Sequence, residues 1–158
     1  MTIRLTIPGP APRKNRADRI GFNASTGKPV RYRSDRAKDW RTDFYGALIA
    51  SPWGSLLGHP IVDGAWSLNV DIYEDRATHD GFPQGDVDSS LSAILDAMQP
   101  RGKGRTAQPG MLDGDHRVTR LFAQKFHDPE NPRVEITLSR VEMPKITERA
   151  RKPRKRKT

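Results

Sequence analysis

The feature that most constrains the fold is a run of alternating apolar and polar residues in the middle of the chain. Within residues 61–73, apolar side chains recur at every second position, at Trp66, Leu68, Val70 and Ile72. Successive side chains of a β-strand point to opposite faces, so this period predicts a strand that is buried on one face. A half-buried strand needs partners, and the run therefore predicts a β-sheet at the centre of the fold.

The remaining segments predict two helices and further strands. Apolar residues recur at helical spacing in residues 34–50 and again in residues 86–98, so each stretch predicts a helix with one apolar face. Shorter runs with strand-like composition occur at residues 2–7, 30–33, 118–126 and 133–138. This order of elements predicts an α+β fold in which two principal helices pack on one small mixed β-sheet.

Charge is distributed unevenly along the chain, whose net charge is +9. Residues 13–41 contain 10 Lys and Arg against three Asp, and residues 145–158 contain 8 Lys and Arg against one Glu, so each segment has a net charge of +7. Residues 42–144 contain 9 Lys and Arg against 15 Asp and Glu, a net charge of −6. Basic segments hold a phosphate backbone, whereas carboxylates hold a metal ion. The pattern therefore favours an enzyme that cuts phosphodiesters over a binding protein that is basic throughout.

The C-terminal segment has the composition of a flexible tail. After Glu142 the chain contains almost no apolar residues, and such a segment cannot bury enough surface to fold alone. We therefore expect one domain over residues 1–142 and a basic, disordered tail over residues 143–158. The chain has no cysteine, which suits a reducing compartment, and no apolar run long enough to cross a bilayer. These features predict a cytoplasmic protein that does not act at a membrane.

Two pairs of aspartates predict the chemistry. Asp86 and Asp88 stand at the start of the second helix, and Asp113 and Asp115 follow that helix and precede the next strand. Residues i and i+2 of extended backbone share a face. If the strand from Val118 packs beside the helix that begins near Asp86, a carboxylate of the first pair lies close to a carboxylate of the second pair. Mg²⁺ prefers such hard oxygen ligands, and bound Mg²⁺ activates water for phosphodiester hydrolysis. Aspartate at a helix start is also typical of an N-cap, and Asp-Gly of a turn, so spacing alone leaves both interpretations open.

Other polar and aromatic residues have simpler interpretations. Asp71 and Glu74, on or after the central strand, are alternative members of this metal site, but we expect both to be solvated. Residues 74–85 are polar without a clear period and predict a mobile loop. Trp40 and Trp66 fall in the apolar patterns of a helix and a strand, so we expect them in the core rather than stacked on bases.

Basic residues mixed with Asn predict contacts with nucleic acid. Lys, Arg and Asn side chains are common partners of backbone phosphates. Contacts of this kind make binding strongly dependent on salt. The predicted DNA-binding residues are Arg13, Lys14, Asn15, Arg16, Arg31, Arg33, Lys103, Arg105 and Lys125.

Several motifs together resemble the RusA family of Holliday junction resolvases, which is common in phages and prophages. A proline-rich turn followed by a Lys-Asn-Arg element occurs at residues 10–16, and the paired aspartates of the family match Asp86-Val87-Asp88. The end of the family's helix is similar to residues 94–98. Its acidic turn is similar to residues 112–118, with one residue inserted here. The resemblance covers roughly residues 2–140.

The resemblance implies a small α+β subunit that works as a homodimer and resolves four-way DNA junctions by paired, symmetric nicks in recombination and repair. The family's catalytic aspartates fall on Asp86, Asp88 and Asp115, with Asp113 as the alternative third residue. The same four residues are implied as ligands of Mg²⁺, for which Mn²⁺ substitutes. Twofold symmetry suits a four-way junction, because two sites nick two strands. The implied setting is the cytoplasm of a bacterium or of a phage-infected host cell.

Two positions depart from the family pattern. The family's Asn and Lys after the second aspartate are Ser89 and Ser92 here, so a positive charge for the phosphate is missing. Lys125, Lys103 and Arg105 are the candidates to replace it. The sequence therefore leaves two functions open: an active, weakened nuclease, or a DNA-binding protein without catalytic activity that uses the same basic segments. Metal-dependent cleavage separates the two.

Overall fold

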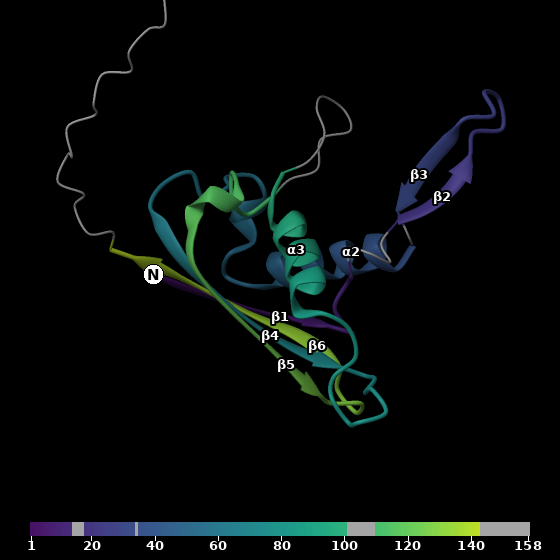
Figure 1. Ribbon diagram of the computed structural model, residues 1–158. Coiled ribbons are helices and arrows are strands. Elements are labelled where there is room, and N and C mark those ends of the chain that lie inside the picture. Colours follow the sequence, from purple (N-terminus) through teal and green to yellow (C-terminus); the bar gives the residue numbers. More distant parts are fainter. Residues whose placement is uncertain (14–17, 34, 101–109, 143–158) are drawn as a thin grey trace, which may run out of the picture.

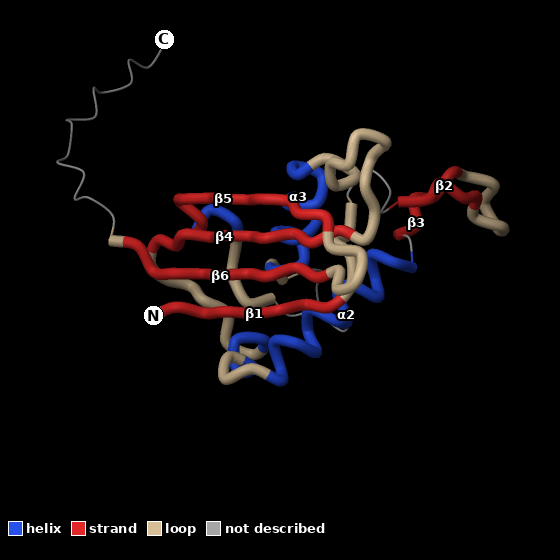
Figure 2. The backbone as a smooth tube through the Cα atoms, turned by 90° about the horizontal axis from the view of Figure 1, so that it is seen from below, coloured by secondary structure: helices blue, strands red, loops and turns tan. Residues whose placement is uncertain are grey.

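The computed structural model describes residues 1–13, 18–33, 35–100 and 110–142 and is built around one four-stranded sheet. In spatial order the strands are β1 (Thr2–Pro8), β6 (Arg133–Val141), β4 (Ala65–Glu74) and β5 (Val118–His127) (Figure 2). β6 runs antiparallel to both of its neighbours, whereas β5 pairs in parallel with β4, so the sheet is mixed.

Two helices, α2 (Asp35–Ala50) and α3 (Val87–Met98), pack on the same face of this sheet (Figure 1). The predicted α+β architecture is confirmed. Trp66 of β4 and Trp40 of α2 are buried, as their apolar patterns predict. Burial of a large apolar side chain contributes about 1.5–3 kcal/mol, which is why the inward half of each pattern fixes the packing. No helix among the described residues is long and apolar enough to span a membrane.

The connection through α3 sets where the two ends of this helix lie. β4 leads into α3, and α3 leads towards β5, which runs in the same direction as β4. A parallel neighbour requires the chain to return to the starting edge, so α3 runs back along the sheet. Figure 1 shows the first turn of α3 on the side of the sheet where β4 and β5 end, and residues 110–117 lead from the other end of α3 to the start of β5.

A two-stranded hairpin projects away from the sheet and the helices (Figure 1). Its strands, β2 (Asp18–Phe22) and β3 (Pro29–Arg33), pair with each other. The sequence predicts β3 and the turn at residues 23–27, but it assigns β2 to a loop. β2 contains Gly21 and no apolar alternation, and its strand structure depends on hydrogen bonds to β3 rather than on its own composition.

The order of strands in the sheet differs from their order in the sequence. Residues 118–126 and 133–138 flank a turn, as predicted, but β5 and β6 are not neighbours because β4 lies between them. The central strand also begins later than the apolar run suggests. Ile61 lies outside β4 and makes an isolated parallel bridge with Leu112.

A buried arginine joins the two helices. Arg41 of α2 is 5% exposed, and its Nη2 donates to the carbonyl oxygens of Asp96, Ala97 and Gln99 at 3.3, 3.4 and 2.9 Å. The last carbonyls of a helix lack intrahelical donors, and a cation at that end also complements the helix dipole. Its Nε donates to the hydroxyl of Tyr45 at 2.8 Å, which orients the guanidinium. Arg41 thus holds the C-terminal end of α3 against α2.

We expect Arg41→Gln to lower the free energy of unfolding by about 1.5–3 kcal/mol, the usual contribution of hydrogen bonds to a charged group. Arg140→Gln is the matched control. Arg140 is 57% exposed and pairs with exposed Asp63 at 3.3 Å, and such a pair contributes about 0–1 kcal/mol. Chemical denaturation followed by circular dichroism measures both losses. Equal losses would show that the contacts of Arg41 do not stabilise α3.

Candidate active site

The first acidic pair is exposed at the start of α3. Asp86 is the N-cap residue, with φ −86° and ψ 138°, and Asp88 lies in the first turn. The side chain of Asp86 makes no capping hydrogen bond. Within the described part of the chain, neither carboxylate has a hydrogen-bond or ion-pair partner. As far as the described residues are concerned, both carboxylates are therefore available to bind a ligand.

A buried glutamate ends β4. The side chain of Glu74 is 0% exposed; its Oε2 lies 3.2 Å from Nη2 of Arg13, and its Oε1 lies 3.3 Å from Nζ of Lys125. The prediction that Glu74 is solvated is wrong. The sequence did contain the signal, because Glu74 continues the inward-facing series of Leu68 and Ile72 and strand alternation turns it towards the core. We refer to Arg13, Glu74 and Lys125 as the Glu74 cluster.

Both cations of the Glu74 cluster also bind the turn that precedes α3. Nη2 of Arg13 and Nζ of Lys125 each donate to the carbonyl oxygen of Gln84 at 2.7 Å. Lys125 also donates to the carbonyl oxygen of Gly85 at 3.1 Å. Gly85 has a φ of +89°, and a Cβ at this position would lie 2.7 Å from the guanidinium of Arg13. The turn therefore requires glycine, and its bonded carbonyls fix the backbone next to Asp86.

The second acidic pair has one bound and one free carboxylate. Asp113 accepts hydrogen bonds from Nε and Nη2 of Arg117 at 2.9 and 2.8 Å. These bonds hold the pKa of Asp113 below its ordinary value and raise the pKa of Arg117. Asp115 begins the short helix η3 (Asp115–Arg117) and is exposed, and within the described residues it has no such partner. Asp115 is therefore better suited than Asp113 to bind a ligand.

The two acidic pairs lie at opposite ends of α3. The backbone N–H groups of Met111 and Leu112 donate to the carbonyl of Met98 at the C-terminal end, whereas Asp86 stands at the N-terminal end. A helix of 12 residues is about 18 Å long. Among the residues that the structure describes, no group of three or more His, Asp or Glu side chains is placed to hold a metal ion. The expected meeting of the pairs is wrong for one chain, because α3 runs back along the sheet before β5 begins.

The predicted DNA-binding residues fall into three groups. Arg13 and Lys125 belong to the Glu74 cluster, where their side chains are 13% and 6% exposed. Arg31 and Arg33 lie on β3, in the projecting hairpin. The others, Lys14, Asn15, Arg16, Lys103 and Arg105, lie outside the described residues. Contact with DNA stays a prediction for all of these residues.

The serines that stand at the family's Asn and Lys positions have different surroundings. Ser89 is 8% exposed, and its Oγ has no hydrogen-bond partner in the described part of the chain. Burial turns this hydroxyl away from the solvent, from which a phosphate would approach. Ser92 is only half-buried. Ser89 is therefore poorly placed to assist the exposed carboxylates of Asp86 and Asp88.

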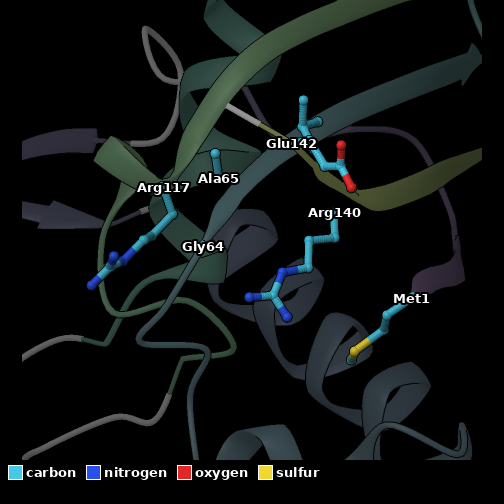
Figure 3. A pocket seen from close by; sticks show the side chains of 7 residues that line it. Met1, Gly64, Ala65, Arg117, Arg140 and Glu142 are labelled. Carbon is cyan, nitrogen blue, oxygen red and sulfur yellow. The ribbon is translucent and has the colours of Figure 1, made fainter. Parts of the chain in front are cut away.

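A pocket of about 950 Å³ lies where β4 begins (Figure 3). Asp86 and Asp88 stand at the start of α3, on the side of the sheet where β4 ends (Figure 1). Figure 3 shows Gly64 between the side chains of Arg117 and Arg140. Because Arg117 also binds Asp113, the pocket neighbours the second acidic pair and not the first. Its lining residues are Met1, Gly64, Ala65, Arg117, Arg140, Val141 and Glu142.

Comparisons with known proteins do not assign the chain to a family. A scan against models of protein families finds no match, and a search of curated proteins finds no relative. The family resemblance therefore stays a prediction from the motifs.

Gly85→Ala tests how closely the Glu74 cluster packs on the turn. Gly81→Ala is the matched control, because Gly81 has a similar φ of +82° but nothing lies within 4 Å of the added Cβ. Both variants strain the backbone by on the order of 1–3 kcal/mol. Gly85→Ala must also displace Arg13 from Glu74. We therefore expect its free energy of unfolding to fall by at least about 1 kcal/mol more than that of Gly81→Ala. Chemical denaturation measures the free energy of unfolding of both variants. Equal decreases would show that the guanidinium of Arg13 moves aside at no cost.

Proposed function

We propose that this chain is a Mg²⁺-dependent, structure-selective endodeoxyribonuclease that resolves four-way DNA junctions by paired, symmetric nicks in recombination and repair. The observation that carries the proposal is the exposed pair Asp86 and Asp88, which α3 does not use for capping. Neighbouring carboxylates repel each other, and a bound cation removes this repulsion. The motifs that resemble the RusA family support a four-way junction as the substrate.

The residues present fit a Mg²⁺ ion. Asp86 and Asp88 supply hard oxygen ligands on a backbone that the Glu74 cluster holds, and few carboxylates suffice because Mg²⁺ keeps several waters. When bound, the ion lowers the pKa of a coordinated water and offsets charge that develops on the phosphate. The positive end of the α3 dipole lies at the same position and attracts the phosphate.

In this proposal a second copy of the chain supplies the third carboxylate. β5 is an edge strand, and its residues Leu121 and Phe122 are 43% and 62% exposed. An unpaired strand edge with exposed apolar side chains is a typical place for pairing with another chain. Antiparallel pairing of two β5 strands about a twofold axis sets the start of one strand beside the end of the other. Asp115 of one copy then approaches Asp86 and Asp88 of the other.

Basic segments supply the contacts with the DNA backbone. Residues 13–41 have a net charge of +7, and within them the hairpin of β2 and β3 carries Arg31 and Arg33 (Figure 1). A two-stranded ribbon fits the major groove of a duplex arm, where its cations lie beside the phosphates. A cytoplasmic location in a bacterium or a phage-infected cell, where such junctions arise, is part of the proposal.

A DNA-binding protein without catalytic activity is the second candidate. Two observations favour it. One chain, as far as it is described, does not assemble a group of three metal-binding side chains, and Ser89 is buried where the family has a polar Asn. The sequence also lacks the family's Lys at Ser92. This candidate predicts junction binding that is independent of Mg²⁺.

We expect the protein to nick a synthetic four-way junction symmetrically with Mg²⁺ or Mn²⁺ and to leave a matched linear duplex uncut. Asp88→Asn removes a ligand charge, so cleavage falls by about 100-fold or more, whereas junction binding is retained or tightened. Asp80→Asn is the control, because this aspartate is 78% exposed in the loop before α3. Gel assays with labelled strands measure cleavage and binding. Binding without cleavage in either metal would favour the second candidate.

Mixing two inactive variants tests whether the site is shared between copies. In a heterodimer of Asp88→Asn and Asp115→Asn, a shared arrangement gives one intact site and one site with both substitutions. We therefore expect each variant alone to be inactive and the mixture to nick one strand of the junction. If every site lies within one chain, both sites of the heterodimer stay defective and the mixture stays inactive. The same gel assay measures the nicks after subunit exchange.

A further inference from the structure

We propose that the Glu74 cluster is a positioning device: Arg13, Glu74 and Lys125 fix the turn before α3 and thereby aim Asp86 and Asp88. The consequence for catalysis rests on the proposed nuclease function, but the claim about the turn does not. In this proposal Arg13 and Lys125 act through the backbone of the turn, not through phosphates of the DNA.

Unequal charge in the cluster explains its connection to the turn. Oε2 of Glu74 accepts from Arg13, whereas Oε1 lies at an ion-pair distance from Lys125 without a well-directed hydrogen bond. One carboxylate thus faces two cations and cannot satisfy all of their donors. Burial of unsatisfied donors is costly, so the remaining donors bind the carbonyl oxygens of Gln84 and Gly85. The carbonyl oxygens of the turn therefore accept the hydrogen bonds that Glu74 cannot accept from the two cations.

The ammonium group of Lys125 has few hydrogen-bond donors available for a phosphate. An ammonium group has three protons. Two of them bind the carbonyl oxygens of Gln84 and Gly85 at 2.7 and 3.1 Å, and Glu74 lies on the remaining side. The side chain is 6% exposed. A contact with DNA would require Lys125 to break these bonds, whereas a positioning role uses them as they are.

The cluster joins segments that are distant in the sequence. Arg13 follows β1, Glu74 ends β4, and Lys125 lies on β5. The loop between β4 and α3 is closed by a hydrogen bond from the N–H of Gln84 to the carbonyl of Arg76 at 2.9 Å. The turn is thus held from the sheet on one side and from its own loop on the other.

A shift of this turn moves the candidate ligands directly. Gly85 immediately precedes Asp86, and Asp88 follows in the first turn of α3. Functional side chains must be held within about 0.5 Å of their productive geometry. The partners that orient a metal ligand therefore change metal affinity or activity by about 10–100-fold when they are removed. We expect an effect of this size from the Glu74 cluster.

Lys125→Met is the main test variant. It removes one charge and both carbonyl contacts, and it leaves Arg13 and Glu74 as a neutral pair. Lys125→Arg restores a cation, and Lys125→Gln replaces the Met variant if that protein does not fold. Arg4→Met is the matched control, since it removes the same charge from an exposed side chain of β1, which has no part in the proposed site or in the DNA contacts. All variants are made in the full chain.

Hydrogen exchange measures the turn without reference to activity. The amides of Gln84 and Ser90 donate to the carbonyls of Arg76 and Asp86, so both report on the backbone around the candidate ligands. We expect Lys125→Met to speed exchange at both amides by about tenfold. Lys125→Arg restores slow exchange, and Arg4→Met leaves it unchanged. Wild-type exchange rates in Lys125→Met would overturn the proposal.

Junction cleavage then separates positioning from phosphate contact. Positioning predicts that kcat of Lys125→Met falls by about 10–100-fold and that half-maximal rate needs more Mg²⁺, while KM and the salt dependence of binding stay the same. A phosphate contact predicts a higher KM and a salt slope lower by about 1, and this result would overturn the proposal. If the wild-type protein cuts no junction with either metal, the proposal that it is a nuclease is wrong. The exchange data then still decide whether the cluster positions the turn.

Discussion

The arrangement of the candidate site depends on the buried carboxylate of Glu74 and the two cations around it. Without this carboxylate, Arg13 and Lys125 would face each other without an anion, and the carbonyls of Gln84 and Gly85 would lose their donors. A buried ion cluster adds little net stability, because desolvation offsets the attraction. It does select one arrangement, since few others give the donors of both cations an acceptor. Here the selected arrangement is the turn that leads into α3.

The path of the chain through α3 has the second large consequence. A helix that connects two parallel strands must return to their starting edge, so its ends lie far apart on the sheet. The acidic pair before α3 and the acidic pair after it are separated for this reason, not because either pair is misfolded. The same path leaves β5 at the edge with Leu121 and Phe122 exposed. The separation of the carboxylates and the position of β5 at the edge of the described sheet are the two features on which the proposal of a site shared between copies rests.

Much of the fold follows from patterns within single segments. The alternating run around Leu68 predicts β4, and the helical spacing around Phe44 and Ile94 predicts α2 and α3, because the period of apolar residues depends only on local geometry. The local pattern does not predict β2, since Gly21 and its charged neighbours form a strand only when β3 supplies hydrogen bonds. The charge of Glu74 predicts a solvated side chain, whereas its position in the alternating series predicts burial, and the structure shows burial.

Most of the elements, the uneven charge and the two acidic pairs follow from the sequence alone, because each is a property of neighbouring residues. The tertiary fold adds the placement of Asp86 and Asp115 at opposite ends of α3, the binding of Asp113 by Arg117, and the contacts of Glu74 with Arg13 and Lys125. These are contacts, or separations, that depend on the direction and order of strands in the sheet. Local sequence patterns do not contain that information, since any order of strands buries the same apolar faces.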